Sequence, residues 1–268
     1  MNIRESYLNG IRPADLKIVD VHAHIGNSAG CHMPLESSDE GIQRMESLGI
    51  SAMCASHLTA IGGDVSVGNK ELFDMCDQYP GKVYGKVFYD PRCPEISLED
   101  IEKYRNHHAF IGVKIHPRES FTYLSDDSYR PLWEYAEKNK LIVTCHTWES
   151  EPMNTPELFF DICGKYTSMK VILAHCGGTY AGYEICYRLV KEFTNVYIDM
   201  NGFIYSCQWI EQAVERFNGV DRIVFGTDQF FNDPRTSIGR VVLSTLSDDE
   251  KRRILYYNFA SICDKFEL

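Results

Sequence analysis

The chain has 268 residues, a formal net charge of -11 at pH 7, 44% hydrophobic residues and 24% charged residues. This is the composition of a globular protein with a substantial core, arranged as one large domain or two small ones. The acidic balance argues against nucleic acid or an anionic membrane as the main partner, because both require clustered Lys and Arg, but it allows a small anionic substrate.

The N-terminal segment, MNIRESYLNGIRPADLK, has no apolar core of signal-peptide length, and no stretch of the sequence approaches a membrane span. The ten cysteines are scattered, without CxxC or zinc-finger spacing. Several lie inside apolar runs, where a reduced cysteine behaves as a small hydrophobic residue. We therefore expect a cytoplasmic protein with free thiols.

Short β-rich runs alternate with helix-length amphipathic segments along the whole chain. The expected strands are 17–25, 51–58, 83–90, 109–116, 141–147, 170–176, 196–202 and 222–228. The clearest helical patterns between them lie at 37–49, 97–105, 130–140, 181–193 and 207–217. In the second of these, Ser97 followed by acidic residues is typical of a helix start.

Eight such units predict an α/β fold, specifically a (β/α)8 TIM barrel, which needs about 250 residues. A doubly wound sheet usually has fewer strands and often a Gly-rich phosphate loop, and the sequence has neither GxGxxG nor GxxxxGK[ST]. No linker, repeat or low-complexity stretch divides the chain. We therefore predict one domain over residues 1–268.

Side chains alternate between the two faces of a strand. On the first expected strand one face carries ionisable residues, namely Asp20, His22 and His24, while Val19, Val21, Ala23 and Ile25 take the other. On the fourth strand the same argument groups Gly112, Lys114 and His116, and on the seventh it groups Asp199 with Asn201. The apolar faces suit a surrounding layer of helices, so the polar faces are expected to point into the barrel.

Polar residues also gather at the ends of the strands. His146, His175 and Asp228 close the fifth, sixth and eighth strands. These ends form one mouth of a TIM barrel, where active sites are built. His22 and His24 are roughly 6–7 Å apart at Cα on a strand, so both imidazoles can reach one cation. Three histidines and an aspartate would bind a divalent ion such as zinc.

Other candidate ligands are set aside. Cys145 directly precedes His146 and Cys176 directly follows His175, so both cysteines are expected to face the other way on their strands. The remaining histidines are interpreted as ordinary core or surface residues, although His57 closes the second strand and could line the pocket.

At this point the sequence resembles the amidohydrolase superfamily, in particular its compact amidohydrolase-related branch, over nearly the whole chain. The motifs that carry the resemblance are VDVHAHIG, GVKIHP, TCHT, LAHCGG, IVFGTDQF and ILYYNFASI, in that order. The resemblance implies that one divalent ion, usually zinc and alternatively manganese, is bound by His22, His24, His146 and Asp228. It also implies that His175 acts beside the metal as an acid/base or supporting group.

Two positions depart from the pattern of that family. Phe230 stands where many relatives have proline after the aspartate, which would reshape the last loop. Lys114 lies on the strand that carries a carboxylated, bridging lysine in binuclear members. A carboxylated Lys114 would place a second metal on His146 and His175. We favour a single metal, and the plain alternative for Lys114 is a buried cation paired with a carboxylate such as Asp199.

The main functional hypothesis is a metal-dependent hydrolase that acts on an amide, lactone or ester bond of a small carboxylate-bearing substrate. Asp228 or His175 would move the proton, and the substrate carboxylate would meet Lys114, His116 and Arg118. The alternative is a non-oxidative decarboxylase of an aromatic or dienoic acid, which the short loops between strands slightly disfavour. A non-catalytic metal-binding protein predicts a damaged ligand set, but every expected ligand is present.

Aromatic residues follow the seventh and eighth strands. Phe203 and Tyr205, together with Phe230 and Phe231, would wall the pocket or form the contact of a homodimer.

Overall fold

The eight expected strands are present and lie side by side in the order in which they occur in the chain. The computed structural model describes residues 1–27, 38–201 and 208–268. All neighbouring strands are parallel. The strands are β1 (Val19–Ile25), β2 (Ala52–His57), β3 (Val83–Phe88), β4 (Phe110–Ile115), β5 (Ile142–His146), β6 (Lys170–Ala174), β7 (Val196–Asp199) and β8 (Ile223–Val224).

The sheet closes between its last and first strands. β8 is shorter than the expected 222–228, because beyond Val224 the main chain bonds to β1 and no longer to β7. The N–H of Val21 donates to the carbonyl of Phe225 at 2.8 Å, and the N–H of Asp228 donates to the carbonyl of His22 at 2.8 Å. The TIM-barrel prediction is therefore confirmed.

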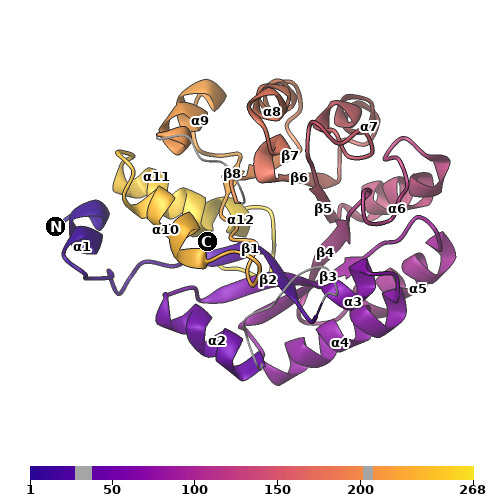
Figure 1. Ribbon diagram of the computed structural model, residues 1–268, viewed down its shortest axis with the longest axis horizontal. Helices are drawn as coiled ribbons and strands as arrows, with labels where there is room; N and C mark the ends of the chain where they lie inside the picture. Colours follow the sequence, from indigo (N-terminus) through magenta and orange to yellow (C-terminus); the bar gives the residue numbers. More distant parts are fainter. Residues whose placement is uncertain (28–37, 202–207) are drawn as a thin grey trace.

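Helices connect successive strands and surround the barrel (Figure 1). They are α1 (Ile3–Leu8), α2 (Ser38–Ser47), α3 (Leu58–Ile61), α4 (Val65–Gln78), α5 (Pro94–Tyr104), α6 (Arg130–Asn139), α7 (Phe159–Lys165), α8 (Tyr180–Glu192), α9 (Trp209–Phe217), α10 (Pro234–Val242), α11 (Asp248–Arg252) and α12 (Asn258–Ala260). Short turns of other helix types are η1 (Asp127–Tyr129), η2 (Pro156–Leu158), η3 (His175–Gly177) and η4 (Arg253–Tyr257).

The start of α5 differs from the prediction. The helix begins at Pro94, whose fixed φ suits a first helical position, so Ser97 lies inside the first turn and does not cap it. The Ser97 hydroxyl accepts the main-chain N–H of Asp90 at 2.9 Å instead and ties the helix to the loop after β3.

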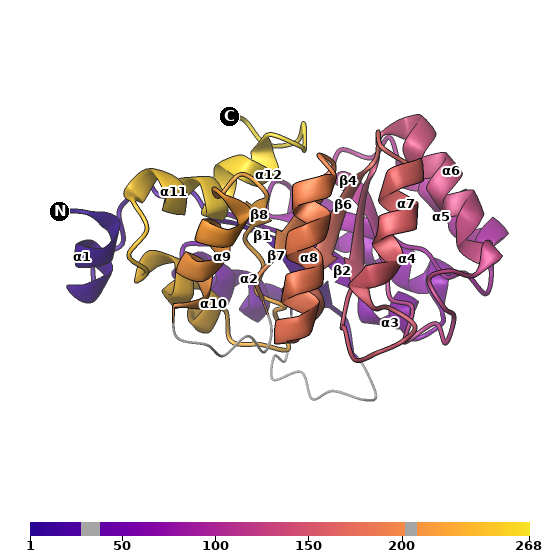
Figure 2. The ribbon, with the colours of Figure 1, turned by 90° about the horizontal axis from the view of Figure 1, so that it is seen from above.

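Two apolar layers build the barrel. The outer layer lies between strands and helices and includes Val113, Leu173, Leu72 and Leu132. The inner layer includes Val19, Ile142, Ile172, Tyr256 and Phe259. Its members come from the beginnings of the strands and from the C-terminal segment, and Figure 2 shows α12 and the C-terminus at one end of the barrel. The opposite end, where the strands finish, is left for polar side chains.

In the described part of the chain, no helix combines the length and apolar character needed to cross a membrane. The eight cysteines that the structure describes are all free, and all but Cys93 are buried.

Candidate metal centre

An irregularity in β1 decides which of its side chains enter the barrel. The pairing of β1 with β2 shifts by one residue between Asp20 and Ala23, which is the signature of a β-bulge. Val21 consequently packs in the inner layer and Ala23 in the outer one, so the expected simple alternation along this strand is wrong. Because of the bulge, the side chain of His22 points into the barrel, while that of Asp20, two residues earlier, lies on the other face of the strand.

The carboxylate of Asp20 binds the segment that follows β8 and is not grouped with the imidazoles of His22 and His24. Its carboxylate accepts the Thr227 hydroxyl at 2.5 Å, the Thr227 N–H at 3.0 Å and the Gln229 side-chain amide at 2.8 Å. Burial raises the pKa of this carboxyl to about 7, although these hydrogen bonds oppose the shift. Asp20 therefore fixes the segment that presents Asp228.

A second bulge lies in β4. The pairing with β3 shifts between Phe110 and Gly112, and Gly112 has a φ of +147°. A Cβ at Gly112 would lie 2.3 Å from the carbonyl oxygen of Ile142, so only glycine fits. As a result Ile111 and Lys114 both face inward, whereas the alternation had placed Ile111 on the outer face.

Three donors meet at the carboxyl ends of β1 and β8. The ligand atoms of His22, His24 and Asp228 all lie within 4.8 Å of one another. Asp228 Oδ1 is 3.2 Å from His24 Nε2 and 3.7 Å from His22 Nε2. Asp228 adopts a φ of +61°, in the left-handed region that is uncommon for non-glycine residues. Both histidines are buried.

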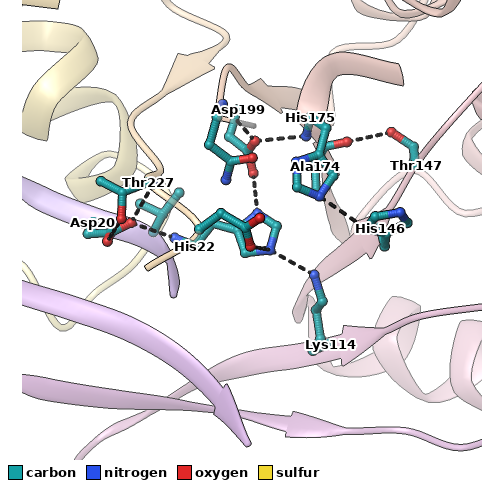
Figure 3. A network of polar contacts seen from close by, with 12 residues as sticks. Asp20, His22, Lys114, His146, Thr147, Ala174, His175, Asp199 and Thr227 are labelled. Atoms are coloured by element: carbon teal, nitrogen blue, oxygen red, sulfur yellow. Dashed lines mark hydrogen bonds and ion pairs between the residues drawn. The ribbon is translucent and has the colours of Figure 1, made fainter. Parts of the chain in front are cut away.

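The orientation of His22 follows from Asp199. Figure 3 shows the imidazole between Asp199 and Lys114. Asp199 Oδ1 accepts the main-chain N–H of His175 at 2.8 Å, and Oδ2 lies 2.9 Å from His22 Nδ1. Because a carboxylate only accepts, Nδ1 carries the proton, and the lone pair of His22 is on Nε2. A carboxylate behind a ligating histidine is the usual way to fix the ligand tautomer.

Lys114 points at that same lone pair. The fully buried ammonium donates to His22 Nε2 at 3.0 Å, so its hydrogen-bond partner is this histidine and not the carboxylate of Asp199 that the plain alternative had named. Burial lowers the pKa of Lys114 to about 8, helped by the buried cation Lys86, while Asp228 and Asp199 raise it. Lys114 thus occupies the space beside the atom that would bind a metal.

The electrostatics of the site favour the ligand forms of these residues. Burial lowers the pKa of His24 and brings that of His22 well below 6.5, with Lys114 contributing to both shifts. Burial alone would raise the pKa of Asp228, but the hydrogen bond from His24 and the neighbouring histidines hold it below its ordinary value. Neutral imidazoles and an ionised carboxylate are the donors that a divalent ion such as zinc or manganese accepts, so the residues fit the expected metal.

His146 and His175 lie beside this group and bond to each other. His175 Nε2 is 3.0 Å from His146 Nδ1, and the His175 ring is 5.0 Å from that of His22. His175, His22 and Asp199 form a second set whose ligand atoms lie within 4.8 Å of one another, whereas His146 belongs to neither set. His175 follows the last residue of β6 and has a φ of +63°, so it does not continue the strand.

The three candidate substrate-binding residues differ in their surroundings. Lys114 is buried against His22. His116 stacks on His146 with ring centroids 4.0 Å apart, and burial brings its pKa well below 6.5. The Arg118 side chain is 60% exposed and pairs with Glu151 at 2.5 Å.

The candidate pocket residues also differ in position. His57 accepts the N–H of Thr59 at the start of α3 and is 3.4 Å from Glu71. Phe230 packs in the outer layer against Gly41 of α2.

Asp199 and Asn201 are both buried in the barrel. Phe203 and Tyr205 lie outside the described residues.

Aromatic and polar side chains surround the histidines of the candidate metal centre. The ring of Phe231 is 5.3 Å from that of His24, and Trp148 lies 6.0 Å from His175 and 6.3 Å from His146. Ser56 Oγ lies 3.1 Å from His24 Nδ1. Sequence reasoning missed Trp148, although its position two residues after His146 was a usable signal.

This architecture, with histidines and a carboxylate gathered where the strands finish, defines a (β/α)8-barrel enzyme. The sequence model of the amidohydrolase family matches residues 19–260, and the chain belongs to this family. No curated protein matches the chain in sequence.

Solved structures share the fold over almost the whole chain. A 2,6-dihydroxybenzoate decarboxylase from Rhizobium is 17% identical with a TM-score of 0.71, over 92% of this chain and 97% of that one. A 5-carboxyvanillate decarboxylase from Sphingomonas paucimobilis is 14% identical with a TM-score of 0.70, over 92% and 99%. A dihydroxybenzoic acid decarboxylase from Polaromonas sp. JS666, solved with manganese and an inhibitor, is 17% identical with a TM-score of 0.70, over 92% and 96%.

Proposed function

We propose that the protein is a metal-dependent hydrolase of an amide, lactone or ester bond in a small carboxylate-bearing substrate. The observation that carries the proposal is the convergence of His22, His24 and Asp228, whose ligand atoms lie within 4.8 Å of one another at the end of the barrel that holds active sites. The single ion is proposed to be zinc, with manganese as the alternative because a structural relative was solved with it. His146 is proposed as a further ligand.

A divalent ion held by these donors would lower the pKa of a bound water toward neutrality and polarise a carbonyl group. Asp228 is the carboxylate in place to accept the proton of the attacking water and to return it to the leaving group. Its Oδ2 accepts the side-chain amide of Asn232 at 3.2 Å, which orients the carboxylate. His175 is the second candidate base, and its Nδ1 has no hydrogen-bond partner among the described residues.

The substrate carboxylate is proposed to lie on the β4 side of the mouth. Lys114 supplies a buried cation there, and Arg118 supplies an exposed one that must leave Glu151 in order to bind a ligand. The expected result of Arg118→Ala is a KM raised about tenfold with kcat little changed, as for the loss of one charged hydrogen bond. An unchanged KM for a carboxylate substrate would show that Arg118 does not bind the substrate carboxylate.

The central experiment combines metal analysis with activity. The purified protein is analysed for metals and then assayed with lactones, amides and carboxylated aromatic acids, before and after chelation. His22→Ala and Asp228→Ala are expected to lose both metal and turnover. Full activity in both variants would refute the metal-dependent mechanism.

A second candidate function is non-oxidative decarboxylation, and the specific observation in its favour is that decarboxylases, beside amidohydrolases, are among the solved structures that share the fold. The same donors would hold the metal, which would bind an oxygen and the carboxylate of the substrate, while a neighbouring acid would protonate the carbon that loses CO₂. Release of CO₂ from an aromatic or dienoic acid, without hydrolysis of any lactone or amide, would select this reaction over hydrolysis.

A further inference from the structure

Asn201 lies beside the candidate metal centre and plays no part in the contacts described so far. It follows Asp199 by two residues, at the point where β7 has ended and the chain passes toward the mouth. The side chain is fully buried. A Cβ built on Gly226 would lie 2.9 Å from Asn201 Nδ2 and 2.9 Å from His22 Cβ, so the carboxamide and the base of His22 flank the same point of the wall.

The carboxamide of Asn201 has no internal partner. Neither Oδ1 nor Nδ2 makes a hydrogen bond within the described ranges 1–27, 38–201 and 208–268. Buried polar atoms are almost always paired, because burying an unpaired amide is unfavourable. Here both ends of one side chain are unpaired at once, which the fold alone does not explain.

A second buried asparagine shows what a structural role looks like in this protein. Asn195, immediately before β7, donates through Nδ2 to the carbonyl of Tyr166 at 2.9 Å and to that of Met169 at 3.1 Å. It joins two segments of the chain. The side chain of Asn201 joins no described segment of the chain, although it is buried as deeply and belongs to the same strand region.

We propose that Asn201 is a substrate-binding residue and that the substrate presents a hydrogen-bond donor next to an acceptor at this point. An amide, especially a lactam, has this pattern: its carbonyl would accept from Nδ2 while its N–H donates to Oδ1. A lactone or ester has no donor and would leave Oδ1 unpaired. This inference rests on the proposed function and narrows its three bond classes to amides.

The test uses two probes that differ by one group. 5-Oxoproline is a lactam with a carboxylate, and 5-oxotetrahydrofuran-2-carboxylate is the lactone of the same shape. Each is titrated into zinc-loaded, ¹⁵N-labelled protein, and the side-chain NH₂ signal of Asn201 is identified by its loss in Asn201→Leu. Product signals in the same tube report hydrolysis, so the proposed function and the role of Asn201 are read separately.

The lactam is expected to shift the Asn201 NH₂ signal and to bind about tenfold or more tightly than the lactone, because the lactone leaves a buried acceptor unpaired. In Asn201→Leu this ratio should fall toward one. An unshifted NH₂ signal at the solubility limit of the lactam, or the same ratio in both proteins, overturns the proposal. Lactam binding without any hydrolysis supports Asn201 and counts against the hydrolase.

Thermal stability separates binding from folding. Asn201→Leu removes a buried amide that has no partner, so its Tm without ligand should equal or exceed that of the unmodified protein. The matched variant Asn195→Leu leaves two carbonyls unpaired and should lower Tm by about 5 °C or more. A comparable loss of Tm in both variants would show that Asn201 is structural and would overturn the proposal.

Discussion

Asp199→Asn tests whether the tautomer of His22 decides metal binding. Asp199 uses both of its oxygens as acceptors: Oδ1 accepts from His175 N at 2.8 Å and Oδ2 accepts from His22 Nδ1 at 2.9 Å. An asparagine has one oxygen and one NH₂, so it can accept only one of them. If the oxygen stays with His175, the NH₂ faces Nδ1, and His22 must move its proton to Nε2, the atom expected to bind the metal.

The magnitude follows from these contacts. Loss of an outer carboxylate behind a ligating histidine typically weakens metal binding about 10- to 100-fold, which corresponds to about 1.4–2.7 kcal/mol. The free energy of unfolding without metal should also fall by about 1–3 kcal/mol, because one hydrogen bond to a buried charge is lost. Competition with a fluorescent chelator measures the first quantity, and urea unfolding measures the second.

A matched control is Asp100→Asn. This buried carboxylate accepts the Ser66 hydroxyl at 3.1 Å and the Asn69 amide at 3.0 Å, and it belongs to α5 in the outer ring. It should lower stability without changing metal affinity. Equal metal affinity in Asp199→Asn and the unmodified protein would show that Asp199 only supports the fold, and the tautomer argument would be wrong.

Two further predictions follow from the interior of the barrel. The Lys114→Met variant should keep one equivalent of metal per chain and bind it more tightly, because the ammonium 3.0 Å from His22 Nε2 no longer competes for the lone pair. A fall from two equivalents to one in metal analysis would instead show that Lys114 bridges two metal ions. Gly112→Ala should destabilise the protein by about 3 kcal/mol or more, since its Cβ would lie 2.3 Å from Ile142 O at a φ of +147°. Gly239→Ala, in α10 with no atom within 4 Å of the new Cβ, is the control and should stabilise by roughly 0.5–1 kcal/mol in the same unfolding assay.

The sequence alone was sufficient for the number of strands, their parallel order and the barrel. These follow from local patterns: apolar runs of strand length, amphipathic helices between them and polar residues at the strand ends. Where a strand runs without interruption, as in β5, alternation also placed individual residues correctly. His146 faces inward while Cys145 packs in the outer layer, because the two-residue period holds along the whole strand.

Alternation failed where a bulge changes the period. In β1 and β4 the bulge inserts one extra residue, so the residues before it point to the opposite face from the one that simple alternation predicts. Asp20 and Ile111 therefore lie on the faces opposite those expected. A bulge is a property of two paired strands, since it is stabilised by the neighbour's register and, at Gly112, by the close approach of Ile142. The sequence of one strand carries little record of it.

Only the tertiary structure decided which side chains share a hydrogen bond. The sequence placed Lys114, Asp199 and His22 in one mouth, but the fold selected His22 as the partner of both others. Among the residues that the structure describes, it also left the carboxamide of Asn201 without a partner. The physical reason is that pairing depends on distances of about 3 Å across the barrel, which arise from the register of eight strands together and not from the local pattern of any one of them.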